Sequence, residues 1–131
     1  MNRAKVIAVF GILFLLTVNC VQPTRQTTVR FEINMQDDDS FDFEMDSVGV
    51  IGEYFPLNWN TPIWFSDSNG DSIYTGSVVI DIPYDTMEFK LIKGNGQIEL
   101  FGKDNRKVGF NDEVRSKTIN TRFDDDRIMR W

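Results

Sequence analysis

The chain has 131 residues, of which 41 % are hydrophobic and 13 % aromatic, enough for one folded domain with a real core. Its 14 basic and 20 acidic residues give a formal net charge of −6, and without the first 19 residues the balance becomes 12 against 20, or −8. Such a surface has no basic stripe to release phosphate counterions. This excludes nucleic acid and anionic lipid headgroups as partners and leaves uncharged ligands open.

The first residues predict an export signal. Residues 1–5 carry two basic side chains, and residues 6–18 form an apolar run of 13 residues. That run is short for a membrane span but has the length of a signal-peptide core. We therefore expect residues 1–19 to be a signal peptide and the protein to be exported to the cell envelope.

Cys20 is the only cysteine, and it closely follows the apolar run. A single cysteine in an exported chain has no internal disulfide partner. Residues 16–20, Leu-Thr-Val-Asn-Cys, resemble a bacterial lipobox, in which Thr17 departs from the usual aliphatic residue. The resemblance implies that Cys20 receives diacylglycerol, with residues 20–27 as a tether to the membrane, on its periplasmic or its cell-surface face. The alternative is an ordinary cleaved signal followed by an unused thiol.

From residue 28 onward apolar and polar residues alternate with a period of two, which predicts strands with one buried face. The expected runs are 29–35, 41–46 leading into 48–52, 63–65, 73–82, 87–92, 97–101, 108–110 and 118–123. Asn69-Gly70 and the glycines around Asn95 are turn signals between them. About seven or eight short strands in residues 28–131 predict one antiparallel sandwich or barrel.

Six pieces of the chain occur in the order of a known family. They are an alternating strand at 28–33, a strand ending in glycine at 48–52, the loop Leu57-Asn58-Trp59-Asn60, an acidic turn with glycine at 67–74, the strand Glu88-Phe89-Lys90-Leu91-Ile92, and the step Asn105-Arg106. In this order residues 28–123 resemble the starch-binding domains of carbohydrate-binding module family 20 and, more distantly, the glycogen-binding modules. The resemblance implies an all-β fold, an antiparallel immunoglobulin-like β-sandwich of about seven or eight strands.

The resemblance also implies a sugar site, and Trp59, Glu88, Lys90 and Asn105 stand at four of its positions. The chemistry agrees, because an indole stacks on the apolar face of a glucose ring while the other three side chains hydrogen-bond its hydroxyls. Glu88 and Lys90 share one face of their strand because side chains repeat every two residues.

The second tryptophan of the family pattern is missing. Counting back five from Asn105 gives Leu100, with Phe101 beside it. A leucine cannot stack as an indole does, and one aromatic contact is worth about 0.5–1.5 kcal/mol, or up to about tenfold in affinity. We expect Trp59 to stack alone or with Phe101, and sugar binding to be weak, altered or absent.

Each site residue also has a plain structural interpretation. Trp59 either folds back onto the core or faces a ligand. Glu88 and Lys90 would otherwise form a solvated strand face, and Asn105 would be a turn residue. Trp64 lies in an apolar run and is expected in the core.

Catalysis is not expected. The chain has no histidine and its one cysteine is assigned to lipidation, so nucleophilic catalysis by Ser-His or Cys-His pairs is excluded. Glycoside hydrolysis needs two carboxylates flanking a cleft, and apolar surroundings single out no such pair here. We expect a protein that is not an enzyme and needs no cofactor.

A metal site is not expected either. Asp67, Asn69 and Asp71 alternate as in a calcium loop, but the glycine stands at position 70 and the distal glutamate is absent, so a turn is preferred. The aspartate triplets at 37–39 and 124–126 are interpreted as solvated loop charge.

The sequence thus predicts a lipid-anchored lipoprotein module that binds an α-glucan or related polysaccharide without cleaving it, beside a partner glycoside hydrolase or envelope protein. The rival hypothesis is a structural or protein-interaction lipoprotein of the same fold that has lost its sugar site. The surroundings of Trp59 distinguish the two, because a sugar site needs its ring exposed and close to Lys90 and Asn105.

Overall fold

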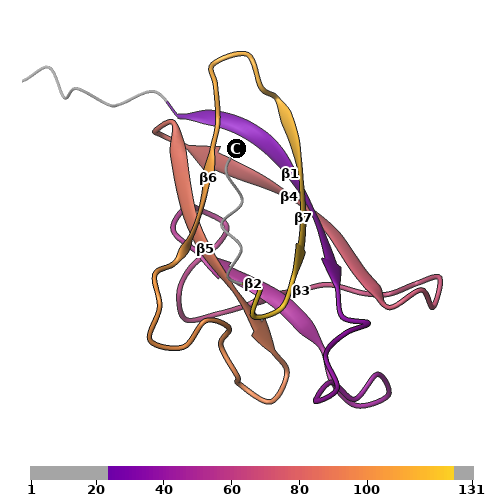
Figure 1. Cartoon of the computed structure of the whole chain (residues 1–131). Helices are drawn as coiled ribbons and strands as arrows, with labels where there is room; N and C mark the ends of the chain where they lie inside the picture. Colours follow the sequence, from indigo (N-terminus) through magenta and orange to yellow (C-terminus); the bar gives the residue numbers. More distant parts are fainter. Residues whose placement is uncertain (1–23, 126–131) are drawn as a thin grey trace, which may run out of the picture.

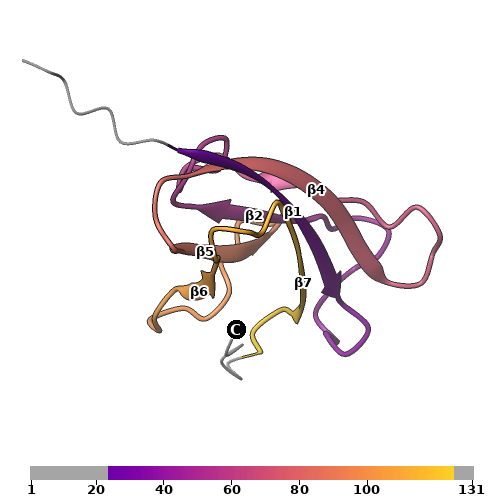
Figure 2. The same cartoon turned by 90° about the horizontal axis from the view of Figure 1, so that it is seen from above.

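The protein is a two-layered β-sandwich. The computed structural model describes residues 24–125, which contain seven strands and no helix. The strands are β1 (Arg25–Asn34), β2 (Val48–Gly52), β3 (Ile63–Trp64), β4 (Ile73–Ile82), β5 (Thr86–Lys93), β6 (Arg106–Gly109) and β7 (Ser116–Arg122). One sheet has the order β4-β1-β7 and the other β3-β2-β5-β6, and the two form the layers visible in Figures 1 and 2. The predicted all-β sandwich is confirmed, with one parallel pair, β1 and β7, among antiparallel neighbours.

Alternation along the strands builds the core. In β1 the side chains of Val29, Phe31 and Ile33 are fully buried between the sheets. Phe31 meets Phe89 of the facing sheet edge-on, with 5.6 Å between ring centroids, and stacks on Phe65 at 5.3 Å. Aromatic pairs in these geometries stabilise a core beyond their buried area, so this cluster joins the two layers.

The first strand begins earlier than expected. Arg25 already pairs with Ile82 of β4, so residues 25–27, which we assigned to the tether, belong to the sheet.

Residues 1–19 and Cys20 lie outside the described residues, and the signal peptide and the lipid anchor stay predictions. Within the described part of the chain, no helix has the length and apolarity to cross a membrane.

The strand expected at 41–46 is wrong, because this segment is a turn. The carbonyl of Asp42 accepts from the amides of Met45 at 3.2 Å and Asp46 at 2.7 Å, and the Asp46 carboxylate accepts from the Asp42 amide at 2.9 Å. Phe41 is buried, whereas Met45 is 82 % exposed. Aspartates that bond their own backbone favour turns over strands, whatever the period of their neighbours.

The strand expected at 97–101 is also wrong and is reduced to one bridge between Ile98 and Ile92. Glu99 turns inward, and its carboxylate accepts a backbone amide of β5 at 2.8 Å. Leu100 then takes a positive φ of 50°, which ends the extended backbone.

The first aspartate triplet is more than solvated charge. Asp38 lies 2.5 Å from the ammonium of Lys93, a side chain that is only 1 % exposed, and also accepts from the hydroxyl of Ser40. Asp37 pairs with Arg122 of β7. Both aspartates therefore fasten the loop after β1 to the body of the sandwich.

The turn expected between β3 and β4 is confirmed. The Asp67 carboxylate accepts from the backbone amides of Gly70, Asp71 and Ser72 at 2.8, 3.2 and 2.8 Å. Among the described residues, no group of three or more His, Cys, Asp or Glu side chains is placed to hold a metal ion.

Candidate functional site

The outer face of the four-stranded sheet carries the predicted site residues of β5. Burial alternates along this strand, with Met87, Phe89 and Leu91 fully buried and Glu88 and Lys90 turned to the outside. The period of two that predicted a shared face for Glu88 and Lys90 is therefore realised.

Glu88 and Asn105 are in direct contact. The Asn105 amide donates to Oε2 of Glu88 at 3.0 Å, and Oε1 lies 3.1 Å from the ammonium of Lys107, the residue of β6 directly opposite Glu88. The hydrogen bonds from Asn105 and Lys107 hold the pKa of Glu88 below its ordinary value of 4.5. The site thus contains a carboxylate that is ionised at neutral pH and able to accept further hydrogen bonds.

Lys90 fastens the loop after β5 to the same face. Its ammonium donates to the carbonyl oxygens of Leu100 and Lys103, both at 3.0 Å. An ammonium has three donors, so one remains after these two bonds. Lys90 therefore shapes the site as well as lining it.

Trp59 is exposed over 41 % of its surface, as the ligand-facing interpretation requires. Its loop is ordered by Asn58, whose side-chain oxygen accepts from the amides of Asn60 and Thr61 at 2.9 and 2.7 Å. The Asn58 carbonyl accepts from Gly52 at 3.2 Å, and Gly52 lies opposite residue 89 of β5. The backbone leading into Trp59 thus runs beside the stretch of β5 that carries Glu88 and Lys90.

Leu100 and Phe101, where the family pattern has its second tryptophan, differ in exposure. Leu100 is 9 % exposed, and its amide donates to Asp124 at 2.6 Å. Phe101 is 94 % exposed and lines a pocket of about 310 Å³ together with Ile98. Leu100 offers no face for stacking, whereas the Phe101 ring is open to solvent.

Sequence reasoning missed the buried pair that supports this loop. Nε and Nη2 of Arg106 each donate to the Glu99 carboxylate at 2.6 Å. Nη2 also donates to the Arg122 carbonyl at 2.8 Å. The only signal was a glutamate placed between Ile98 and Leu100, an unusual position for a charge in an apolar run.

The core position expected for Trp64 is wrong, because its ring is 47 % exposed on the outer face. Trp64 pairs with Gly49, a residue without a side chain, at the free edge of the sheet. The neighbouring Phe65 turns inward instead and takes the core position. A strand of two residues at an edge leaves one of its faces uncovered.

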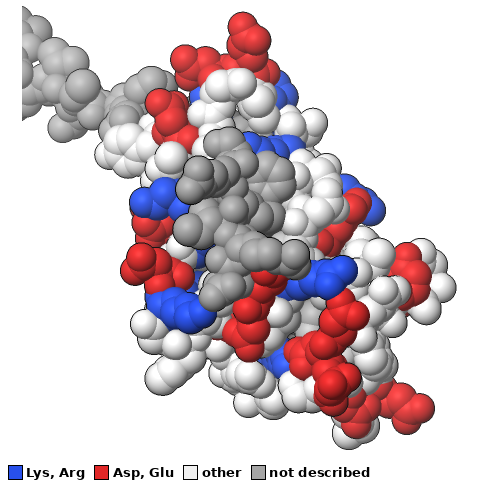
Figure 3. All heavy atoms as spheres, in the orientation of Figure 1, with Lys and Arg blue, Asp and Glu red and all other residues white. Residues whose placement is uncertain are grey.

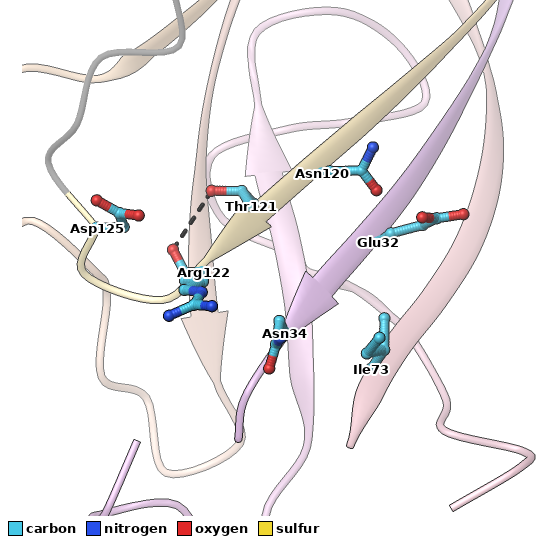
Figure 4. Close-up of a pocket in the computed structure, with 7 residues that line it drawn as sticks. All are labelled: Glu32, Asn34, Ile73, Asn120, Thr121, Arg122 and Asp125. Carbon is cyan, nitrogen blue, oxygen red and sulfur yellow. Dashed lines mark hydrogen bonds between the residues drawn. The ribbon is translucent and has the colours of Figure 1, made fainter. Parts of the chain in front are cut away.

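Two further hollows lie away from the predicted residues. One, of about 300 Å³ on the outer face of the three-stranded sheet, is shown in Figure 4 and is lined by Glu32, Asn34, Ile73, Asn120, Thr121, Arg122 and Asp125. None of its lining residues is aromatic. The other hollow, of about 420 Å³, has five aspartates in its wall. Acidic side chains, red in Figure 3, gather in the lower part of that view, where the loop after β1 lies. Neither hollow contains a residue of the predicted sugar site.

Solved structures of other proteins share this fold. Glycoside hydrolase family 15 glucoamylase from Hypocrea jecorina aligns with a TM-score of 0.58 and 21 % sequence identity over 79 % of this chain and 18 % of that chain. Gamma-CGTase from alkalophilic Bacillus clarkii aligns with a TM-score of 0.54 and 20 % identity over 75 % of this chain and 15 % of that chain. This chain spans less than a fifth of either protein, and identities this low show the fold alone. No family model and no curated protein matches the sequence.

Proposed function

We propose that the protein is a non-catalytic carbohydrate-binding module for starch or another α-glucan, anchored to a membrane of the cell envelope through lipid on Cys20. The observation that carries the proposal is the hydrogen bond of 3.0 Å between Asn105 and Glu88, on the face that also presents Lys90. Glu88, Lys90 and Asn105 were each chosen from the family resemblance. They share one polar surface, although Asn105 lies 17 positions after Glu88 in the chain.

The polar groups on this surface match the rim of a glucose ring. The Glu88 carboxylate and the side-chain oxygen of Asn105 can accept hydrogen bonds from sugar hydroxyls. The remaining N–H of the Lys90 ammonium can donate one to a sugar oxygen. Trp59, exposed over 41 % of its surface, would supply an apolar face from the loop that is hydrogen-bonded to Gly52, opposite β5. Stacking of a pyranose on an indole combined with hydrogen bonds to its hydroxyls gives both affinity and orientation.

Binding without cleavage fits the charge state of the site. A glycosidase needs one carboxyl group with a raised pKa to protonate the leaving oxygen. The pKa of Glu88 is shifted the other way, downward, by Asn105 and Lys107. The two structures of similar fold reported above are a glucoamylase and a CGTase, which supports the proposal of a carbohydrate ligand.

The membrane anchor would hold the domain close to the lipid. Since β1 begins at Arg25, five residues after Cys20, a fully extended connection spans at most about 18 Å. Labelled palmitate should be incorporated into the wild-type protein in bacterial cells and not into Cys20→Ser. Equal labelling of both proteins would refute lipidation at this cysteine.

Calorimetry and affinity electrophoresis with amylose, maltoheptaose and cyclodextrin test the sugar ligand. The unmutated protein should be retarded by amylose, and Trp59→Ala should weaken this retardation and lower the affinity up to about tenfold. No retention of any glucan by the unmutated protein would refute the proposal and favour the structural or interaction lipoprotein.

A further inference from the structure

An apolar row crosses the outer face of the four-stranded sheet. Trp64 pairs with Gly49, Gly49 with Ile92, and Ile92 with Ile98, so these four residues lie side by side on four adjacent segments. Trp64 is 47 % and Ile98 38 % exposed, and no charged side chain belongs to the row. Three strand spacings make the row about 14 Å long.

Gly49 allows the indole of Trp64 to lie against the sheet. A Cβ atom at Gly49 would stand 2.9 Å from Cε3 of Trp64, which is closer than such atoms approach in proteins. The ring therefore occupies the space that a side chain on β2 would fill. Trp64 thus lies close over Gly49 and still keeps nearly half of its surface open, so the indole is available for stacking.

The row continues at its other end into an open pocket. Ile98 lines the pocket of about 310 Å³ whose wall also includes the exposed Phe101 ring. Apolar surface thus extends from the β3 edge of the sheet to the loop that Lys90 holds in place.

A polar row lies beside the apolar one. Lys90 is two residues from Ile92 on the same face of β5, a distance of about 7 Å along the strand, and Glu88 with Asn105 follows one step further. An apolar strip flanked by donors and acceptors fits a partner that has apolar faces and hydroxyl edges along its length. An uncharged oligosaccharide has this chemistry, whereas a charged peptide would find no counter-charge on the row.

We propose that Trp64, laid across Gly49, is a second aromatic platform of the sugar site, taking over the stacking that buried Leu100 cannot provide. The inference rests on the proposed function and deepens it, because it assigns the ligand as a chain of several glucose units that runs along the row from Trp64 towards Phe101. A single glucose contacts only part of this surface.

Calorimetry of four proteins with maltoheptaose and with maltose tests the assignment. Trp64→Ala should lose up to about tenfold in affinity for maltoheptaose and less for maltose, while Trp64→Phe should retain part of the binding. Tyr84→Ala is the matched control, because Tyr84 is an aromatic residue exposed over 58 % of its surface on the loop between β4 and β5. Its affinity should equal that of the wild type.

A fluorescence measurement covers the case in which Trp64→Ala does not fold. Replacing Trp59 and Trp131 by phenylalanine leaves Trp64 as the only tryptophan of the chain. Saturating maltoheptaose should then protect the Trp64 emission from quenching by acrylamide.

The outcomes separate this inference from the proposed function. If Trp59→Ala weakens binding while Trp64→Ala binds like the wild type and Trp64 emission is not protected, the sugar site stands without Trp64. If the unmutated protein binds no glucan, the proposed function fails and the inference with it. A dimer seen by sedimentation that Trp64→Ala dissociates, without any effect on sugar affinity, would assign the row to self-association instead.

Discussion

Glu99 and Arg106 form a bidentate ion pair inside the sandwich, with two hydrogen bonds of 2.6 Å and side chains that are 0 % and 6 % exposed. Glu99 also accepts the amide of Leu91, and Arg106 donates to the carbonyl of Arg122. The pair thereby ties β5, β6, β7 and the loop between β5 and β6 together beneath the candidate sugar site. Its geometry satisfies the polar groups that burial removes from water.

Arg106→Met should destabilise the protein by about 3–5 kcal/mol, because it leaves the carboxylate of Glu99 buried without its counter-charge. The free energy of unfolding, measured in urea, checks this. Arg30→Ala is the control, since Arg30 pairs with Glu32 on the surface with 49 % of its side chain exposed. Arg30→Ala should lower the free energy of unfolding by about 1 kcal/mol or less. Equal losses in the two variants would mean that the buried pair contributes no more than an exposed one.

Strands with a regular period of two could be predicted from the sequence: β4 and β5 agree closely with the expectation, and β1 was predicted as a strand although it begins four residues earlier. The period failed at residues 41–46 because the aspartates there bond their own backbone. It failed again at Glu99, whose side chain replaces a partner strand by accepting from the β5 backbone. The first failure is local, because bonds between neighbouring aspartates and their backbone compete with a strand, and the second depends on a loop returning to β5; alternation encodes neither.

The candidate site was predictable in part. The spacing of Glu88 and Lys90 gave their common face, and the family resemblance added Asn105, which reaches Glu88 from 17 positions away. The position of Trp64 was not predictable from local composition. Its exposure depends on β3 being a short edge strand opposite Gly49, a relation that only the sheet order defines.

Gly76→Ala should destabilise the protein by about 1–3 kcal/mol through overpacking. A Cβ atom at Gly76 would lie 2.7 Å from Cε1 of Phe65, whose ring is held against Phe31. Ser77→Ala, on the opposite and exposed face of β4, should change stability by less than about 0.5 kcal/mol. Urea unfolding provides the measurement.

A double-mutant cycle identifies the cause of the Gly76→Ala effect. Phe65→Leu removes the ring that the new methyl group meets, so the double variant should be more stable than the sum of the two single changes predicts. Strict additivity would show that the methyl group of the alanine does not meet Phe65.

Asp38 should make the stability of the protein sensitive to acid. Partial burial raises the pKa of Asp38, but the hydrogen bonds from Lys93 and Ser40 and the charge of Lys93 outweigh this and hold it below the ordinary value of 3.8. The unfolded chain therefore takes up this proton first as the pH falls. The stabilisation by Asp38 is complete above about pH 5 and is lost as the pH falls through 3.8 and then through the lowered pKa.

Urea unfolding of the wild type and Asp38→Asn between pH 2 and pH 7 checks this dependence. At pH 6 Asp38→Asn should be less stable by about 1–3 kcal/mol, since a hydrogen bond to a charged group is lost. The difference should shrink as the medium becomes acidic. Asp39→Asn, at the exposed neighbouring position, should follow the wild type throughout. A difference for Asp38→Asn that is independent of pH would contradict the role of its charge.

Asn105→Ala should raise the pKa of Glu88 towards 4.5, because the hydrogen bond from Asn105 is the largest cause of its lowering. The carbon resonance of the Glu88 carboxyl group, followed by NMR during an acid titration, reports this shift directly. Lys107→Ala should also raise the pKa, and added salt should weaken the contribution of Lys107 more than that of Asn105, since the ammonium is 60 % exposed and acts through its charge. Asp104→Ala, next to Asn105 but without a bond to Glu88, is the matched control. If Asn105→Ala leaves the Glu88 titration unchanged, the two side chains do not meet in solution, and the polar half of the candidate sugar site is not assembled as described.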